Sequence, residues 1–324
     1  MQQEYLTCPV IDGHVDIVYE MMRHHENIPF HRLSESPVTP DKLAAGNVRI
    51  VVTALYCSDS RNGPETAAAC LQELFRYADS YLMPQLDHIK SVQELESCFA
   101  AGSGSPPGTL LLLENADALM ELDLTVLKSK ALKVVGLTHA GRNRIGDGNS
   151  VPSPTGLTRE GKHLAKRLER EGFALDVAHL SDPCFWDLVD SFHGPLISSH
   201  TGFRFFCPKP RNLDKDQLKT LIERNGLVGV SVNPEMLSED NQASLQDVFK
   251  HIDWVVQSYG PDYVALGSDF CGFDVICEGL EDISKFPDLA EKLVKSGYPA
   301  DAVSKIMGGN WYRLYASLLS NTGI

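Results

Sequence analysis

Histidines and carboxylates that follow short apolar runs are the residues of this chain best suited to chemistry. His14 and Asp16 end the first such run, which begins at Val10. Side chains on an extended chain alternate between two faces, so residues two positions apart point the same way. One imidazole and one carboxylate that converge at a strand end form half of a metal site. The same pair also fits a turn followed by a helix-capping aspartate. The residues that end the other apolar runs are therefore needed to choose between a metal site and a structural turn.

Other apolar runs end in the same kind of residue. They place further ionisable groups at Glu114, His139, His179, His200 and Asp269. If the runs are parallel strands of one barrel, their carboxyl ends meet at a single rim, where the active sites of such barrels form. One histidine at a strand end is usually structural, but burying so many charges together without a metal ion would cost several kcal/mol for each. The pattern therefore predicts a metal centre.

The donor types indicate which metals and how many. Imidazole and carboxylate ligands without thiolate favour zinc, with manganese, cobalt or iron as alternatives. A single catalytic zinc takes three protein ligands, and this chain offers more, so two Zn²⁺ ions are expected. A water between the ions would ionise near neutral pH and become the nucleophile. We expect one ion on His14 and Asp16, the other on His179 and His200, and Glu114 as the bridge.

Two further residues are candidates for acting on the substrate. Asp269 is left over from the metal ligands and is free to take or relay a proton. Arg211 lies in a proline-containing loop, where an arginine is usually solvated. A substrate with a free carboxylate needs a cation, however, and a bidentate guanidinium suits it.

Eight apolar runs must position these residues. Helical patterns lie between most of the runs, and the long segment 58–108 leaves room for an extra helix. Runs that are apolar on both faces suit parallel strands covered by helices. Regular alternation over 324 residues predicts an α/β protein, a (β/α)8 TIM barrel with a single domain over 1–324. The expected strands are 10–14, 48–56, 109–114, 133–139, 173–179, 195–200, 226–232 and 263–269. The expected helices are 64–83, 158–171, 182–191, 214–225, 245–259, 289–296 and 300–319.

Composition narrows the class of protein. Hydrophobic residues make up 43% and charged residues 22% of the chain, as in globular proteins. A net charge of -14 argues against nucleic acid and anionic membranes as partners. The first residues show no signal-peptide pattern, the last show no lipid-anchor tail, and no run is long enough to span a bilayer, so we expect a cytoplasmic protein. The eight cysteines form no Cys-x-x-Cys pair and are expected to be reduced and mostly buried.

The order and spacing of these motifs resemble the membrane dipeptidase (renal dipeptidase) family of zinc metallopeptidases. The likeness covers nearly the whole chain. It rests on Asp-Gly-His-Val-Asp at 12–16, Leu-Thr-His at 137–139, His179, Ser-His at 199–200, Arg-Asn-Leu at 211–213, Gly-Ser-Asp-Phe at 267–270 and Gly-Gly-Asn at 308–310. The resemblance implies a (β/α)8 barrel with two zinc ions that cleaves dipeptides, including some with a D-residue or dehydro residue at the C-terminal position.

The resemblance also implies a role for each site residue. His14 and Asp16 match the first metal pair, Glu114 the bridging glutamate, and His179 and His200 the second metal pair. His139 matches the substrate-binding histidine that meets the tetrahedral oxyanion. Arg211 matches the arginine that binds the substrate carboxylate, and Asp269 matches the catalytic aspartate.

The chain departs from the family pattern at three positions. Val15 stands where the family usually has Asn, Asn115 where it has Gly, and Cys271 where it often has Asp. None of the three is a metal ligand, so the metal prediction stands, whereas substrate specificity stays open. The family's membrane anchor is not evident either, so the resemblance does not decide the location.

The sequence leaves two alternative functions open, and it is compatible with more than one oligomeric state. Another two-metal amidohydrolase could act on an ester, lactam or cyclic amide. Such enzymes usually show His-x-His on the first strand and often a carbamylated lysine, whereas this chain has Asp16 and no strand-ending lysine. A non-catalytic metal-binding barrel is the other alternative, against which Asp269, His139 and Arg211 argue. The expected partner is a small dipeptide, and a homodimer is compatible with the sequence.

Overall fold

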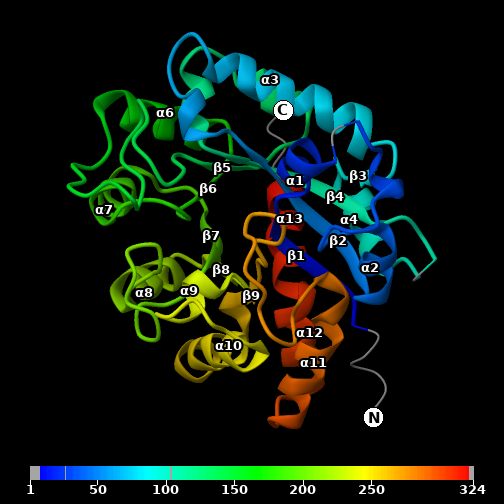
Figure 1. Ribbon diagram of the computed structural model, residues 1–324. Helices are drawn as coiled ribbons and strands as arrows, with labels where there is room; N and C mark the ends of the chain where they lie inside the picture. Colours follow the sequence, from blue (N-terminus) through cyan, green and yellow to red (C-terminus); the bar gives the residue numbers. More distant parts are fainter. Residues whose placement is uncertain (1–7, 26, 103, 321–324) are drawn as a thin grey trace.

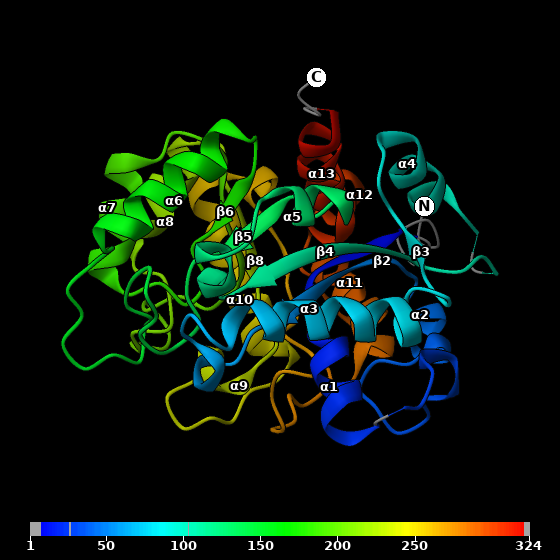
Figure 2. The ribbon, with the colours of Figure 1, turned by 90° about the horizontal axis from the view of Figure 1, so that it is seen from above.

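Eight parallel strands form a nearly closed barrel in the computed structural model, which describes residues 8–25, 27–102 and 104–320. Figures 1 and 2 show the strands at the centre and the helices around them. This arrangement confirms the predicted (β/α)8 barrel. The strands of the barrel, in order, are β1 Val10–Val15, β2 Val48–Tyr56, β4 Gly108–Glu114, β5 Val134–Gly136, β6 Ala174–Asp176, β7 Leu196–Thr201, β8 Leu227–Val230 and β9 Val264–Leu266. A short strand, β3 Asp87–His88, pairs with β4 outside this ring.

The ring closes where the carboxyl end of β1 meets the chain that follows β9. Val15 forms a parallel bridge with Phe270. The Asp269 amide donates to the His14 carbonyl at 3.0 Å, and the Asp16 amide donates to the Phe270 carbonyl at 2.9 Å. The first and last parts of the predicted site therefore lie side by side.

The helices cover the outside of the ring (Figure 1). Two of the expected helices, α7 and α10, have the predicted bounds, and α4 is the extra helix of the segment 58–108. The predicted cap of α6 is present, since the Thr158 hydroxyl accepts a hydrogen bond from the Gly161 amide at 2.9 Å. The helices are α1 Ile17–His24, α2 Pro40–Ala45, α3 Ala67–Tyr77, α4 Val92–Ala100, α5 Thr125–Ser129, α6 Arg159–Arg170, α7 Asp182–Ser191, α8 Lys215–Glu223, α9 Pro234–Leu237, α10 Leu245–Tyr259, α11 Phe286–Lys295, α12 Ala300–Ser304 and α13 Asn310–Ser320.

The single helix predicted over 300–319 is interrupted. A π-helical turn, Lys305–Gly309, separates α12 from α13. At Gly308 the backbone approaches β1 so closely that a Cβ atom would lie 2.6 Å from the Pro9 carbonyl oxygen. Apolar spacing predicts a helix, but it does not reveal a close approach between two backbones that are distant in the sequence.

The interior of the barrel is a separate apolar core. Trp311 and Tyr315 of α13 belong to the same buried apolar cluster as inward-facing residues of the barrel strands. The Trp311 indole donates to the Leu266 carbonyl at 2.6 Å. A Cβ atom at Gly13 would lie 2.3 Å from the Trp311 ring, so only glycine fits between Asp12 and His14. This contact explains the glycine of the first motif by packing.

Across the described ranges, no helix is both long and apolar enough to cross a membrane. The eight cysteines are free, and all except Cys8 are buried. The termini, on which the expected absence of a signal peptide and of a lipid-anchor tail depends, lie largely outside the described residues.

Candidate active site

The carboxyl ends of the strands bring together all of the residues predicted to do chemistry. His14 lies on β1 with Asp16 just after it, Glu114 is the last residue of β4, and His200 lies on β7. The chain leaves the sheet earlier than predicted at β5, β6 and β9, so His139, His179 and Asp269 lie in the loops that follow. A cavity of about 1190 Å³ opens above this end of the barrel. Its wall includes Asp16, Glu114, His139, His179, Arg211 and Asp269.

Two groups of ligand atoms lie next to one another below this cavity. In the first group, His14, Asp16 and Asp269 each offer an atom within 4.8 Å of the others. In the second, Glu114, His179 and His200 do the same. Glu114 Oε1 lies 2.8 Å from Nε2 of His179 and 3.9 Å from Nε2 of His200. The second group is the predicted bridging glutamate with its two histidines.

The first group differs from the prediction by one member. Asp16 Oδ2 lies 3.4 Å from His14 Nε2, as expected for a pair that shares a cation. Asp269, which the sequence assigned to proton transfer, belongs to the same group and has an oxygen 3.7 Å from His200 Nε2. Asp269 therefore lies between the two predicted metal positions.

Buried nitrogen atoms test whether the site suits a metal ion. His14 Nε2 is buried and has no hydrogen-bond partner among the described residues. The Nε2 atoms of His179 and His200 face each other at 3.2 Å. Buried polar atoms are normally paired, so imidazole nitrogens arranged in this way, with carboxylates beside them, fit divalent cations such as zinc.

The protonation of the histidines agrees with this fit. Burial, with the charges of Arg211 and His139, lowers the pKa of His179 to about 3. Burial also lowers the pKa of His200, so both rings are neutral, as metal ligands must be. Burial lowers the pKa of His14 too, but the negative charge of Asp16 outweighs it and raises the pKa to about 10. The surroundings of His14 therefore favour a positive charge at the position predicted for the first ion.

His139 has a partner that the sequence pattern did not reveal. Its Nδ1 lies 2.8 Å from Oδ2 of Asp59, which also accepts a hydrogen bond from the Gly141 amide. Burial opposes protonation of His139, but the Asp59 hydrogen bond and the charge of Glu114 outweigh it and raise the pKa of the ring. Asp59 follows β2 by three residues, and this position after an apolar run is the signal that could have identified it.

Arg211 presents a cation to the cavity. Its Nη2 lies 3.2 Å from His179 Nε2 and donates to the His200 carbonyl at 3.3 Å. None of the ion pairs found across residues 8–25, 27–102 and 104–320 involves it. A guanidinium without a carboxylate partner inside the protein is available to one on a ligand.

Comparisons with known proteins identify the family. The profile described as membrane dipeptidase (peptidase family M19) matches residues 3–321. The chain belongs to this family. Membership confirms the resemblance read from the motifs, and it makes the protein a peptide-bond hydrolase of a metallopeptidase family.

Two relatives of the family show how far the sequences diverge. The dipeptidase aclJ of Aspergillus oryzae is 26% identical over 97% of this chain and 79% of its own length. An uncharacterised protein from the region 5′ of pqqA in Klebsiella pneumoniae is 32% identical over 59% of this chain and 74% of its own.

Solved structures share the barrel. A metallopeptidase of Rhodobacter sphaeroides, liganded with a phosphinate mimic of the dipeptide L-Ala-D-Ala, has a TM-score of 0.82 at 24% identity, over 97% of this chain and 99% of that one. The dipeptidase AC, a metallopeptidase of family M19, has a TM-score of 0.80 at 25% identity, over 98% and 99%. The probable dipeptidase PvdM of Pseudomonas aeruginosa has a TM-score of 0.84 at 17% identity, over 98% of each chain, which concerns the fold alone.

The three departures from the usual family pattern do not line the cavity. Val15 is fully buried, and Cys271 is buried with its thiol 3.6 Å from the Ser36 hydroxyl. Asn115 has a positive φ of 72°, a conformation that asparagine tolerates better than most residues. Its amide donates to the Cys57 carbonyl at 2.8 Å and to Asn62 Oδ1 at 2.7 Å. None of the three side chains is therefore placed to contact a ligand in this cavity.

Proposed function

We propose that this member of the dipeptidase family hydrolyses dipeptides with two zinc ions, held by His14, Asp16, Glu114, His179 and His200. The supporting observation is the pair of adjacent ligand groups beneath a cavity lined by Arg211, which forms no ion pair with any residue that the structure describes. When bound, the two ions would share a water of lowered pKa and polarise the scissile carbonyl. Manganese, cobalt or iron could replace zinc at such ligands.

The protein's own residues supply the remaining interactions. Arg211 would bind the free carboxylate of the dipeptide, and the guanidinium would thereby set which bond reaches the metal positions. His139, held by Asp59 through Nδ1, would donate from Nε2 to the oxygen of the tetrahedral intermediate. This donation requires a proton on the ring, which the raised pKa favours.

Asp269 would move the proton. Burial and the charge of Asp16 raise its pKa to about 7. Bound cations would lower this pKa again, so that the carboxylate would be ionised and able to accept a proton. Asn233 donates to Asp269 Oδ2 at 2.9 Å and so holds the carboxylate in place. The other oxygen, Oδ1, faces the metal positions and would pass the proton to the leaving amine.

A dipeptide panel tests the proposal. Purified protein should release free amino acids from L-L, L-D or glycine-containing dipeptides. The L-D members are included because one structural relative carries a mimic of L-Ala-D-Ala. Activity should vanish with a chelator and return with Zn²⁺. Chelator-sensitive turnover of an ester, lactam or cyclic amide without any dipeptide would instead support another amidohydrolase. Full metal occupancy without turnover of any compound would support a non-catalytic barrel.

Asp269→Asn separates the proton-transfer role from metal binding. The variant should retain both ions but lose most turnover, because an amide cannot accept the proton. Metal content and kcat should therefore be measured on the same preparation. Loss of an ion from Asp269→Asn would show that Asp269 is a ligand and would contradict the assignment.

A further inference from the structure

A buried serine contacts two of the predicted metal ligands, His14 and His200, at the ring nitrogens that do not face the predicted metal positions. Ser199 belongs to β7 and is fully buried. Its hydroxyl lies 3.1 Å from Nδ1 of His14 and 2.8 Å from Nδ1 of His200. The two rings are 3.8 Å apart between centroids. One hydroxyl therefore contacts one ligand from each predicted metal pair.

A buried carboxylate completes this contact. Asp176, the last residue of β6, lies beside Ser199 and offers an oxygen within 4.8 Å of ligand atoms of His14 and His200. Its Oδ1 accepts from the Ser199 amide at 2.9 Å and from the Ala178 amide at 3.0 Å, which fixes the carboxylate. The sequence pattern did not single out Asp176, because it stands within an apolar run rather than at its end.

The hydrogen-bonding capacity of a hydroxyl allows one consistent assignment. A serine hydroxyl has one proton to donate and two lone pairs, whereas a carboxylate only accepts. If both rings bind metal through Nε2, each Nδ1 carries a proton, and the two lone pairs of the Ser199 hydroxyl accept from Nδ1–H of His14 and Nδ1–H of His200. The hydroxyl proton is then left for the neighbouring Asp176 carboxylate. In this tautomer each ring keeps a lone pair on Nε2, the nitrogen that faces Asp16 in one case and Glu114 in the other.

We propose that Ser199 and Asp176 are positioning residues that set one tautomer for both His14 and His200, so that a single hydroxyl prepares both metal positions. The inference rests on the proposed two-metal function, and it names the residues that orient two of the metal ligands. Partners that orient ligating histidines commonly contribute ten- to a hundredfold to metal affinity. Here the Ser199 hydroxyl would contribute to the binding affinity of both ions.

A third metal position is the competing interpretation. His14, Asp176 and His200 also offer atoms within 4.8 Å of one another. The Ser199 hydroxyl, however, already lies at hydrogen-bond distance from both Nδ1 atoms. An ion bound there would need the Nδ1 lone pairs of His14 and His200. In the assigned tautomer both Nδ1 atoms carry a proton instead, which they donate to Ser199.

Ser199→Ala tests the proposal with metal affinity as the readout. The apo variant and wild type should be titrated with Zn²⁺ against a chromophoric chelator, and bound metal counted by elemental analysis. Wild type should bind two ions, and Ser199→Ala should bind both about ten- to a hundredfold more weakly. The absorption of bound Co²⁺ would report whether both coordination environments change.

The neighbouring serine provides a matched control. Ser198 lies on the same strand and is equally buried, but its hydroxyl has no hydrogen-bond partner within the described part of the chain. Ser198→Ala removes the same atom from the adjacent position. It should bind both ions with wild-type affinity, and circular dichroism of the apo proteins should show all three folded.

Asp176→Asn tests the direction of the hydrogen bonds. The amide oxygen would keep the two backbone donors, which leaves the NH₂ group to donate to Ser199. The serine proton must then turn to one histidine, whose Nε2 would carry a proton and lose its metal. Asp176→Asn should therefore weaken one ion, whereas Ser199→Ala weakens both.

The outcomes separate the inference from the proposed function. If wild type does not bind two ions, the proposed function is wrong. If wild type binds two and Ser199→Ala binds them equally well, the positioning role is wrong. A third ion in wild type that Ser199→Ala loses would overturn the inference in favour of a metal at His14, Asp176 and His200.

Discussion

At the scale of single residues, Asp59 and Arg211 decide how a substrate would be held. Asp59 holds one nitrogen of His139 and leaves the other for the cavity that the ring lines. Arg211 reaches the same cavity with its charge unpaired by the described residues. Neither residue belongs to the metal groups, so changes to either should alter kinetics without removing metal.

Asp59→Asn should lower kcat by about ten- to a hundredfold with little change in KM. The amide cannot hold a protonated ring as the carboxylate does, and a histidine donor to an oxyanion acts mainly in the transition state. Steady-state kinetics on one dipeptide would measure the split, with Asp216→Asn on the exposed face of α8 as control. Partial recovery in Asp59→Glu is expected, and an increase confined to KM would argue against an oxyanion role.

Arg211→Ala should weaken binding of free dipeptides and spare those with an amidated C-terminus. Loss of a charge-assisted hydrogen bond costs about 1.5–3 kcal/mol, or roughly ten- to a hundredfold in kcat/KM. Lys209 lines the same cavity, but its ammonium donates to the Glu235 carbonyl at 3.0 Å. Lys209→Met should therefore affect both substrates alike. An equal effect of Arg211→Ala on the two substrates would count against carboxylate binding.

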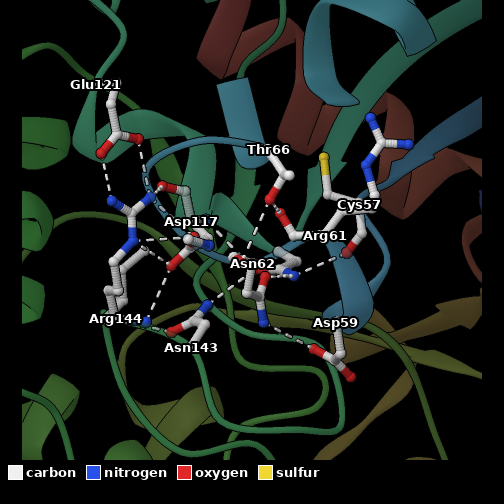
Figure 3. Close-up of polar contacts among 12 residues, drawn as sticks. Cys57, Asp59, Arg61, Asn62, Thr66, Asp117, Glu121, Asn143 and Arg144 are labelled. Carbon is white, nitrogen blue, oxygen red and sulfur yellow. Dashed lines mark hydrogen bonds and ion pairs between the residues drawn. The ribbon is translucent and has the colours of Figure 1, made fainter. Parts of the chain in front are cut away.

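At the scale of elements, a polar network ties together the loops that follow β2, β4 and β5. Figure 3 shows Arg144 beside Asp117, in the short helical turn Ala116–Met120, with Asn62 and Asn143 close by. Asn143 donates to Asn115 Oδ1 at 2.8 Å, and Asp117 accepts from the Gly63 amide at 2.7 Å. These loops carry Asp59 and His139 and begin directly after Glu114, so the network positions the site from outside.

Asp117→Asn should destabilise the protein by about 3 kcal/mol, because it leaves part of a buried ion pair without its partner. Asp117 is buried, and its carboxylate lies 2.8 Å from Arg144 Nη2. Thermal unfolding would measure the loss as a Tm lower by several degrees. Glu121→Gln, which removes the more exposed partner of the same arginine, should cost 1 kcal/mol or less. An equal loss of stability in the two variants would mean that burial does not determine how much each ion pair of Arg144 contributes.

The same variant has a pH dependence with a defined sign. Burial would raise the pKa of Asp117, but hydrogen bonds from Arg144 and Gly63 outweigh it and hold the pKa below its ordinary value. A lowered pKa in the folded state adds stability above the ordinary value of about 4, and this stability is lost as the pH falls through the folded value. The Tm difference between wild type and Asp117→Asn should therefore shrink below about pH 4.

At the scale of the whole molecule, the barrel closes around a concentration of negative charge. Asp12, Asp16, Glu114, Asp176 and Asp269 are all buried near the carboxyl ends of the strands. The net charge of -14 adds a repulsive background. Bound cations would offset this repulsion, so metal should contribute to stability as well as to catalysis.

Removal of metal should therefore lower Tm. A ligand present at a hundred times its Kd stabilises the folded state by about 2.7 kcal/mol, which corresponds to several degrees for a chain of this size. Calorimetry of the apo protein with and without added Zn²⁺ would measure the shift. His179→Ala, which removes a predicted ligand, should show a smaller shift, and an unchanged Tm in wild type would contradict a bound metal centre.

Local pattern alone determined the barrel and most of the residues at its rim. Apolar runs bounded by helical patterns predicted all eight strands, and His14, Asp16 and Glu114 lie at strand ends as expected. This succeeds because strand formation and the end of a strand depend on residues that are neighbours in the chain. The family motifs then supplied Arg211, for which local sequence left a choice.

Only the tertiary structure decided which side chains meet. His139 finds Asp59 across 80 positions of the chain, and His14 finds Ser199 across 185. It also decided that Asn115 faces a polar network and that Asp269 lies beside His200 as well as in the group with His14 and Asp16. Hydrogen bonds of this kind depend on the register and closure of the barrel, because an angle or offset of one strand changes which atoms come within 3 Å. Periodicity within a segment carries no information about that geometry.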